Sequence, residues 1–278
     1  MEQSQYYFLV SGLPELQLGD ERAVYPYAEY LDDLADWVTN EDAAHIRMVR
    51  LPFDNYNAIT LLTGTMRPFD KRGNFTRTML EAELKSPADA PGYLYEFATA
   101  LRENRPIVAN RSWEDQLNEL YYTYIEESGT VYWRAYSDFD RHLRNGLAAR
   151  NLKLQTADRT ETDARRSVVI GDDDVTETII KSSAPDFSLS SYYTWADAVL
   201  AAPHTDLAAF ELQIDRLRWE MAEELIATDT FGVAALQAFG VRLGIAHRWA
   251  QLDKTQGKSK LTSHIERLLH SNSVIAAH

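Results

Sequence analysis

Apolar residues recur at steps of three and four positions along most of the chain, the spacing that places side chains on one face of an α-helix. The first long stripe follows Pro26, a residue that suits the first turn of a helix, and it predicts an amphipathic helix over residues 26–39. Its apolar positions are Tyr27, Tyr30, Leu31, Leu34, Trp37 and Val38. We therefore expect these side chains to share one apolar face.

A second pair of helices is predicted near the middle of the chain. Ser112 is followed three residues later by Asp115, an arrangement similar to a capping box, and it predicts the start of a helix over 113–127. The stripe stops near Gly129, and the same period then resumes and runs to Ala149. We expect the two helices to form a hairpin.

Pro203 separates two further helices. The one before it carries Tyr192, Trp195 and Val199 and is predicted to end before this proline. The one after it carries apolar residues at alternating steps of three and four, an a/d seam over two heptads. Another helix is expected over about residues 230–252, where Gly240 and Gly244 lie one turn apart and leave room for a tight helix crossing. A last amphipathic helix is predicted over about 259–270.

Strand signals are confined to residues 6–10 and 168–170, so we expect no large sheet. The predicted fold class is mainly α, with multi-helix bundle units and at most short β segments. A polar, unpatterned stretch over 151–174 is the best linker candidate. It divides the chain into N-terminal helical units over 1–150 and a C-terminal helical unit over 175–278.

The amino-acid composition excludes several classes of partner and binding site. The 278 residues include 28 Lys and Arg against 42 Asp and Glu, a formal net charge of −14, and no cysteine. This charge repels phosphate backbones, so we expect no nucleic-acid partner, and the missing cysteine excludes disulfides and thiolate metal sites. The N-terminal residues lack the basic region and the apolar length of a signal peptide, and no stretch approaches the roughly 20 apolar residues of a spanning helix. We expect a cytoplasmic protein without direct membrane insertion.

Motifs of established chemistry are missing from the sequence. The seven histidines contain no pair with the spacing of a helical metal site, and the acidic run 172–174 lacks the alternating ligand positions of a calcium loop. Phosphate-binding loops, the dinucleotide-binding fingerprint and the serine-hydrolase elbow are also missing. We therefore predict no catalytic residue, no metal and no cofactor. An enzyme with an unrecognised helical active site is a minor alternative.

Two neighbouring stretches carry opposite charge. Residues 206–226 have a net charge of −4, and residues 241–267 have a net charge of +4. These stretches either pair with each other in a helical hairpin or offer charge to a partner. Asp215 and Arg248 are the residues we select as the first test of such pairing.

Several segments, in order, resemble an uncharacterised bacterial family encoded beside components of V-type ATPases. That family in turn resembles the C subunit of V-type ATPases, known in eukaryotes as the d subunit. The segments are YYFLVSGLPE at 6–15, VYWRAYSDFDRHLRNGLAARN at 131–151, SAPDF at 183–187, FELQIDRLRW at 210–219 and IAHRWAQLD at 245–253, followed by Gly257 and Lys258.

The resemblance implies an all-helical, funnel-like protein of three related helical units. Such a protein sits on the cytoplasmic end of the membrane rotor ring, receives the rotating central shaft and has no catalytic activity. Two short internal echoes are compatible with repeated units, because an aromatic and an acidic residue precede an apolar helical segment at both 53–62 and 139–148.

The function expected from the resemblance is a non-catalytic central-stalk subunit of a bacterial V-type ATPase or ATP synthase, peripheral to the inner face of the cell membrane. Its partners would be the rotor shaft subunits and the membrane ring. The alternative is a helical adaptor or assembly factor of the same ATPase that is not part of the rotor. Because aromatic and arginine residues often anchor interfaces, we name Asp215, Trp219, Arg248 and Trp249 as interface candidates.

Overall fold

The computed structural model of the chain describes residues 5–18, 26–155, 162–203, 205–226 and 229–251. Helices dominate these residues and no strand occurs among them, so the predicted mainly α fold class is confirmed. The helix predicted over about 259–270 lies outside the described residues. None of the helices within the described ranges is both long enough and apolar enough to cross a membrane.

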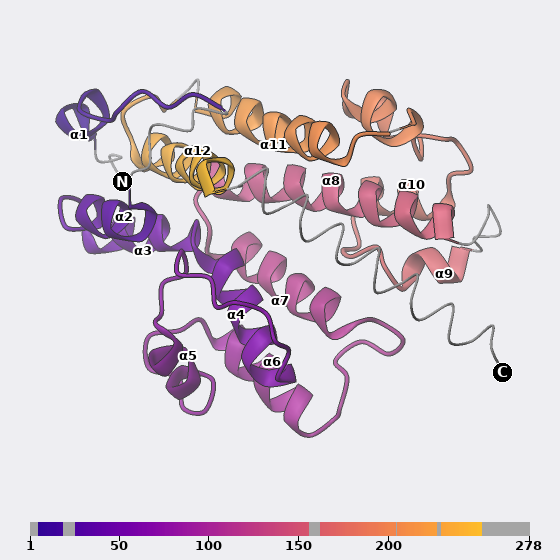
Figure 1. The fold of residues 1–278 in the computed structure, drawn as a ribbon, viewed down its shortest axis with the longest axis horizontal. Helices are drawn as coiled ribbons and strands as arrows, with labels where there is room; N and C mark the ends of the chain where they lie inside the picture. The colour runs from indigo at the N-terminus through magenta and orange to yellow at the C-terminus, as the bar shows by residue number, and fades with distance from the viewer. Residues whose placement is uncertain (1–4, 19–25, 156–161, 204, 227–228, 252–278) are drawn as a thin grey trace, which may run out of the picture.

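The first eight helices are α1 (Tyr7–Ser11), α2 (Tyr27–Ala35), α3 (Asn40–Met48), α4 (Leu51–Thr63), α5 (Arg77–Glu83), α6 (Gly92–Arg102), α7 (Trp113–Ser128) and α8 (Val131–Gln155). They are followed by α9 (Thr162–Arg166), α10 (Asp174–Lys181), the short 3₁₀-helix η1 (Leu189–Ser191), the π-helix η2 (Asp197–Ala201), α11 (Leu207–Glu224) and α12 (Val233–Gln251). The long helix α8 packs against α7, α10, α11, α12 and η2. Figure 1 shows α11 on one side of α8, α4 to α7 on the other, and α2 and α3 at one end.

The predicted hairpin is confirmed in α7 and α8, which pack against each other after a short turn. The Ser112 hydroxyl accepts a hydrogen bond from the Asp115 backbone N–H at 3.1 Å, so the predicted helix start is also confirmed. This bond satisfies one of the N–H groups that the first turn of a helix leaves without a partner.

The helix predicted over 26–39 is shorter in the structure. It ends at Ala35, and a second helix begins at Asn40, where the Thr39 hydroxyl accepts from the Asp42 N–H at 3.2 Å. Thr39 has the extended backbone of an N-cap residue, which is incompatible with continuation of the preceding helix and begins a new helix. The chain therefore turns at residues 36–39, and Trp37 leaves the apolar face.

Both strand predictions are wrong. Residues 7–11 form helix α1, residue 168 lies in a turn, and residues 169–170 belong to no helix or strand. The buried Asn145 side chain takes the place of a strand partner, because its amide accepts from the Ile170 N–H at 3.0 Å and donates to the Ile170 carbonyl at 2.7 Å. One amide side chain thus satisfies a backbone that would otherwise need a neighbouring strand.

Helix α12 lies between the N-terminal helices and the C-terminal helix α11. It packs against α11 and also against α2 and α3, and its sides contribute to both apolar core clusters. A Cβ added to Gly240 would lie 3.2 Å from Val49, and one added to Gly244 would lie 3.2 Å from the Tyr27 ring. The predicted tight crossing is therefore confirmed, and its partners are the N-terminal helices.

The expected division at residue 150 lies within α8, which runs from Val131 to Gln155. Side chains from both sides of that boundary share the larger core cluster. The division into units stays a prediction.

Candidate interaction site and cavity

The four interface candidates lie on α11 and α12, and three of them meet. Asp215 accepts hydrogen bonds from Arg248 and from the Trp249 indole N–H, both at 2.8 Å, on its Oδ2 oxygen. Its Oδ1 oxygen lies 3.4 Å from Arg218. Trp219 lies one turn further along α11, where the Arg242 guanidinium is 5.6 Å from its ring.

The pairing of the two oppositely charged stretches is confirmed for the described residues. Arg248 also donates to Glu211 at 2.7 Å, and Arg242 donates to Glu223 at 2.7 Å. These bonds and the Asp215 contacts run along the seam between α11 and α12. The remaining bases of the positive stretch lie outside the described residues. Part of the charge of both stretches is therefore neutralised by ion pairs within the molecule.

This arrangement limits what the candidates can offer a partner. Asp215 is 2% exposed and Trp219 is 8% exposed, so neither can be reached without opening the seam. Arg248 and Trp249 are partly exposed but already hydrogen-bonded. The contacts make all four residues part of the internal packing of α11 on α12, and their role toward a partner stays a prediction.

A second group of polar residues ties the loop after α4 to that helix. The fully buried Asp54 accepts hydrogen bonds from the Asn74 N–H at 3.0 Å, from the Asn74 side-chain amide at 2.7 Å and from the Phe75 N–H at 3.3 Å. Burial raises the pKa of Asp54 to about 6, although these bonds and Arg50 act in the opposite direction. The carboxylate faces the loop backbone, so its role is to hold the loop.

His142 on α8 lies between a carboxylate and a phenol, next to the start of α10. The two ring nitrogens of His142 lie 2.7 Å from the Tyr193 hydroxyl and 3.0 Å from Asp173. Burial acts to raise the pKa of Asp173, but hydrogen bonds from His142 and Thr176 hold it below its usual range. Asp173 also caps α10. Because both ring nitrogens have protein partners, this cluster holds α10 against α8.

Exposed aromatic side chains gather at the end of the molecule formed by α1, α2 and α3. Phe8 is 89% exposed, Trp37 is 74% exposed and Tyr7 is 59% exposed. The Tyr6 hydroxyl accepts from the Thr39 N–H at 3.3 Å, which holds α1 beside the turn that carries Trp37. Exposed apolar side chains that form a contiguous patch often mark an interaction surface.

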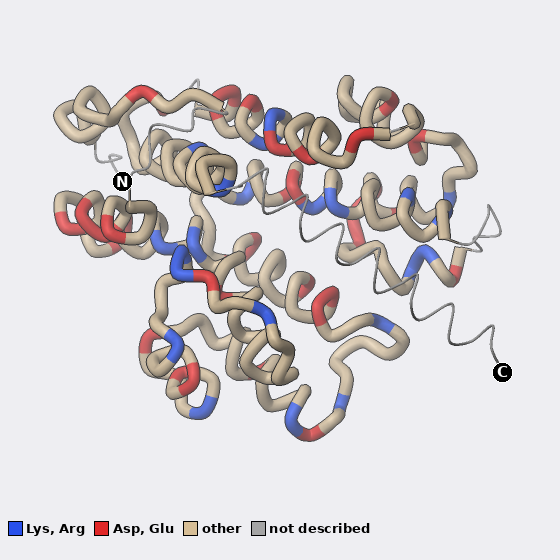
Figure 2. The backbone as a smooth tube through the Cα atoms, viewed as in Figure 1, with Lys and Arg blue, Asp and Glu red and all other residues tan. Residues whose placement is uncertain are grey.

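The same end is acidic. The exposed acids of α2, α3 and the turn between them are Glu29, Asp32, Asp33, Asp36 and Glu41, and the one exposed arginine there is Arg47. Figure 2 shows this concentration of Asp and Glu on α2 and α3. We call Tyr7, Phe8, Trp37 and these acids the acidic aromatic end. Its chemistry fits a partner that presents Lys or Arg beside apolar groups.

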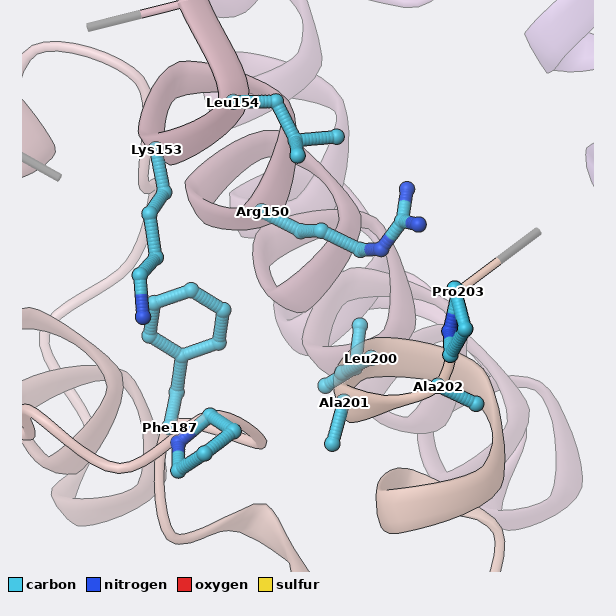
Figure 3. Close-up of a pocket in the computed structure, with 9 residues that line it drawn as sticks. Arg150, Lys153, Leu154, Phe187, Leu200, Ala201, Ala202 and Pro203 are labelled. Carbon is cyan, nitrogen blue, oxygen red and sulfur yellow. The ribbon is translucent and has the colours of Figure 1, made fainter. Parts of the chain in front are cut away.

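A cavity of about 350 Å³ opens where the C-terminal part of α8 meets η2. Its lining consists of Arg150, Lys153, Leu154, Pro185, Phe187, Leu200, Ala201, Ala202 and Pro203. In Figure 3 the two basic side chains leave α8 on either side of the opening, Lys153 toward Phe187 and Arg150 toward Pro203. No group of three or more metal-ligating side chains with metal-site geometry occurs within the described ranges.

Comparison with known proteins places the chain in a family. A family model described as a protein of unknown function, DUF2764, matches residues 3–272. The chain belongs to the DUF2764 family. Searches of curated proteins and of solved structures give no match. The family match covers the helices of the α11–α12 seam, the cavity and the acidic aromatic end alike.

Sequence reasoning missed both the acidic aromatic end and the cavity of this DUF2764 protein. Helical periodicity places Trp37 on an apolar stripe, and the signal against it is the Thr39-to-Asp42 cap that starts a new helix. The cavity has no such local signal, because α8, the 185–187 segment and η2 meet only in the folded chain.

Proposed function

We propose that this DUF2764 protein is a non-catalytic central-stalk subunit of a bacterial V-type ATPase or ATP synthase, where it couples the rotor shaft to the membrane ring. The observation that carries the proposal is the ordered resemblance of its segments to the family encoded beside components of V-type ATPases. The segments begin at residue 6 and continue to residue 258, so the likeness covers most of the chain.

Each internal echo contains an asparagine that holds the backbone of a later loop, about four residues after Phe53 in the first echo and about six residues after Phe139 in the second. In the first, the Asn57 amide on α4 donates to the Asp70 carbonyl and accepts from the Asp70 N–H, both at 2.8 Å. In the second, the Asn145 amide on α8 donates to the Ile170 carbonyl and accepts from the Ile170 N–H. Each of these loops leads to a short helix with a side-chain N-cap, Thr76 for α5 and Asp173 for α10.

Torque transmission requires a stiff body, and the centre of this molecule is built for stiffness. Helix α12 is buried along most of its length between the two core clusters. The ion pairs of the α11–α12 seam fasten its other side. A force applied at α2 and α3 would therefore pass through α12 to α11 and α8, because packed interiors deform little.

The acidic aromatic end supplies the expected contact surface. Shaft or ring subunits that present Lys and Arg would gain electrostatic steering from the acids and apolar burial from Phe8 and Trp37. A protein in this position would be held at the inner face of the cell membrane through the complex.

The experiment is a pull-down of the tagged chain from detergent-solubilised membranes of its own host, with mass spectrometry of the bound subunits. Recovery of shaft and ring subunits in a fixed ratio is the expected result. The Phe8→Ala/Trp37→Ala variant should recover much less of them, whereas Met66→Ala, which alters an equally exposed apolar side chain in the loop after α4, should not. Recovery of the chain alone from wild type would refute the proposal.

The alternative is an adaptor or assembly factor of the same ATPase that leaves once the complex is complete. This alternative is supported by the same resemblance and the same contact surface. The two roles differ in whether the chain stays in the finished complex. If the chain is recovered with early subassemblies and is missing from the finished ATPase, the adaptor is correct and the stalk position is wrong.

A further inference from the structure

The open cavity between α8 and η2 is lined by two basic side chains and by apolar residues. Its volume of about 350 Å³ falls within the range of small-molecule sites, roughly 300–1,000 Å³. Arg150 and Lys153 lie one helical turn apart on α8, and every other lining residue is apolar.

The charge of Arg150 is available to a ligand. Its guanidinium lies 5.3 Å from the centre of the Phe210 ring, and no carboxylate of the described residues pairs with it. An arginine held by an aromatic face keeps its planar donors pointed outward and suits a carboxylate or a phosphate. Figure 3 shows the guanidinium at the side of the cavity, toward Pro203.

The backbone around the cavity is unusual in two places. Phe187 and Ser188 adopt left-handed conformations, with φ of 57° and 61°, which side chains other than glycine and asparagine rarely adopt. The buried Asp186 holds this turn, because it accepts from the Ser188 N–H at 3.0 Å and from the Ser190 N–H at 2.9 Å. Strained backbone of this kind collects at ligand sites.

The opposite wall is the π-helix η2, a conformation that is rare and frequent at functional sites. Its Leu200 reaches α8 because Gly146 has no side chain, and an added Cβ there would lie 2.9 Å from Leu200. The widened turn also brings Ala201 and Ala202, two small residues, to the cavity wall. Small residues on this wall keep the volume open.

We propose that this cavity binds a small amphiphilic anion, with a carboxylate or phosphate group at Arg150 and a short apolar body against Phe187, Leu200 and Ala201. The Arg150 guanidinium supplies charge-assisted hydrogen bonds, and the apolar wall removes the body of the ligand from water. This site is independent of the proposed coupling function, since it uses neither the acidic aromatic end nor the α11–α12 seam.

Isothermal titration calorimetry of the full chain tests the proposal with matched probes. Octanoate and octyl phosphate carry both features, octanol lacks the charge, and acetate lacks the apolar body. Octanoate or octyl phosphate should bind at one site at least tenfold more tightly than octanol or acetate, and the stronger of the two identifies the head group. If neither binds, or if octanol binds equally well, the proposal is wrong.

Variants locate the site. Arg150→Gln should weaken binding of the stronger probe about tenfold, whereas Arg134→Gln, an exposed arginine near the other end of α8, should leave it unchanged. Ala201→Leu should abolish binding by filling the cavity without a change of charge. Circular dichroism establishes that each variant is folded. Undiminished binding by folded Arg150→Gln and folded Ala201→Leu would place the ligand elsewhere and overturn the assignment.

Discussion

Replacement of Asp215 by alanine should destabilise the protein by about 3 kcal/mol. The Trp249 indole N–H, now 2.8 Å from Asp215, would lose its acceptor in a partly buried position. An orphaned donor of this kind costs roughly 1–3 kcal/mol. Arg248 keeps its bond to Glu211, and its side chain is 37% exposed, so solvent reduces the loss of its ion pair to about 1 kcal/mol.

Asp215→Asn is the control that separates the two contributions. An asparagine side chain keeps an oxygen that can accept from Trp249 but removes the negative charge that pairs with Arg248. This variant should therefore lose only about 1 kcal/mol. Arg248→Ala, made alone and together with Asp215→Ala, gives the coupling energy of the pair directly.

Equilibrium unfolding in urea, followed by circular dichroism and by tryptophan fluorescence, measures these differences. The loss in Asp215→Asn should shrink at high salt, because ions screen the partly exposed pair. A loss below about 1 kcal/mol in Asp215→Ala would refute the reasoning, since an orphaned donor alone costs at least that. Equal losses in the alanine and asparagine variants would show that the Trp249 bond contributes nothing.

Three further predictions concern single positions. The pKa of Asp54 rises from 3.8 to about 6 on folding, so unfolding releases its proton between these values and its contribution to stability falls as the pH increases. Urea unfolding from pH 4 to pH 7 should show wild type losing about 2 kcal/mol relative to Asp54→Asn, and a constant difference would contradict the shift. Gly240→Leu should cost about 1–3 kcal/mol, because even a Cβ there lies 3.2 Å from Val49; an unchanged urea midpoint would mean that the crossing is loose. Ser112→Ala should cost about 1 kcal/mol through the lost cap of α7, and Ser112→Thr, which keeps the hydroxyl, should recover most of it.

The helical features that depend on neighbouring residues could be predicted from the sequence. The spacing of apolar positions predicted α7, α8, α11 and α12, and Ser112 marked the start of α7. The charge contrast left internal pairing and a charged partner as alternatives, and the contact between Asp215 and Arg248 bears out the first for the described residues. Period, cap and charge are local properties, so the sequence contains them directly.

Features that depend on contacts between distant segments required the tertiary structure. Helical periodicity placed Trp37 on an apolar face, yet the end of α2 at Ala35 moved it to the surface. The apolar run at 168–170 resembles a strand, but Asn145 supplies its hydrogen bonds from α8. The cavity exists only because Gly146 admits Leu200 to α8 and a strained turn places Phe187 beside it. The exposure of a side chain and the presence of a cavity depend on which segments meet, and that is decided by the packing of the whole chain.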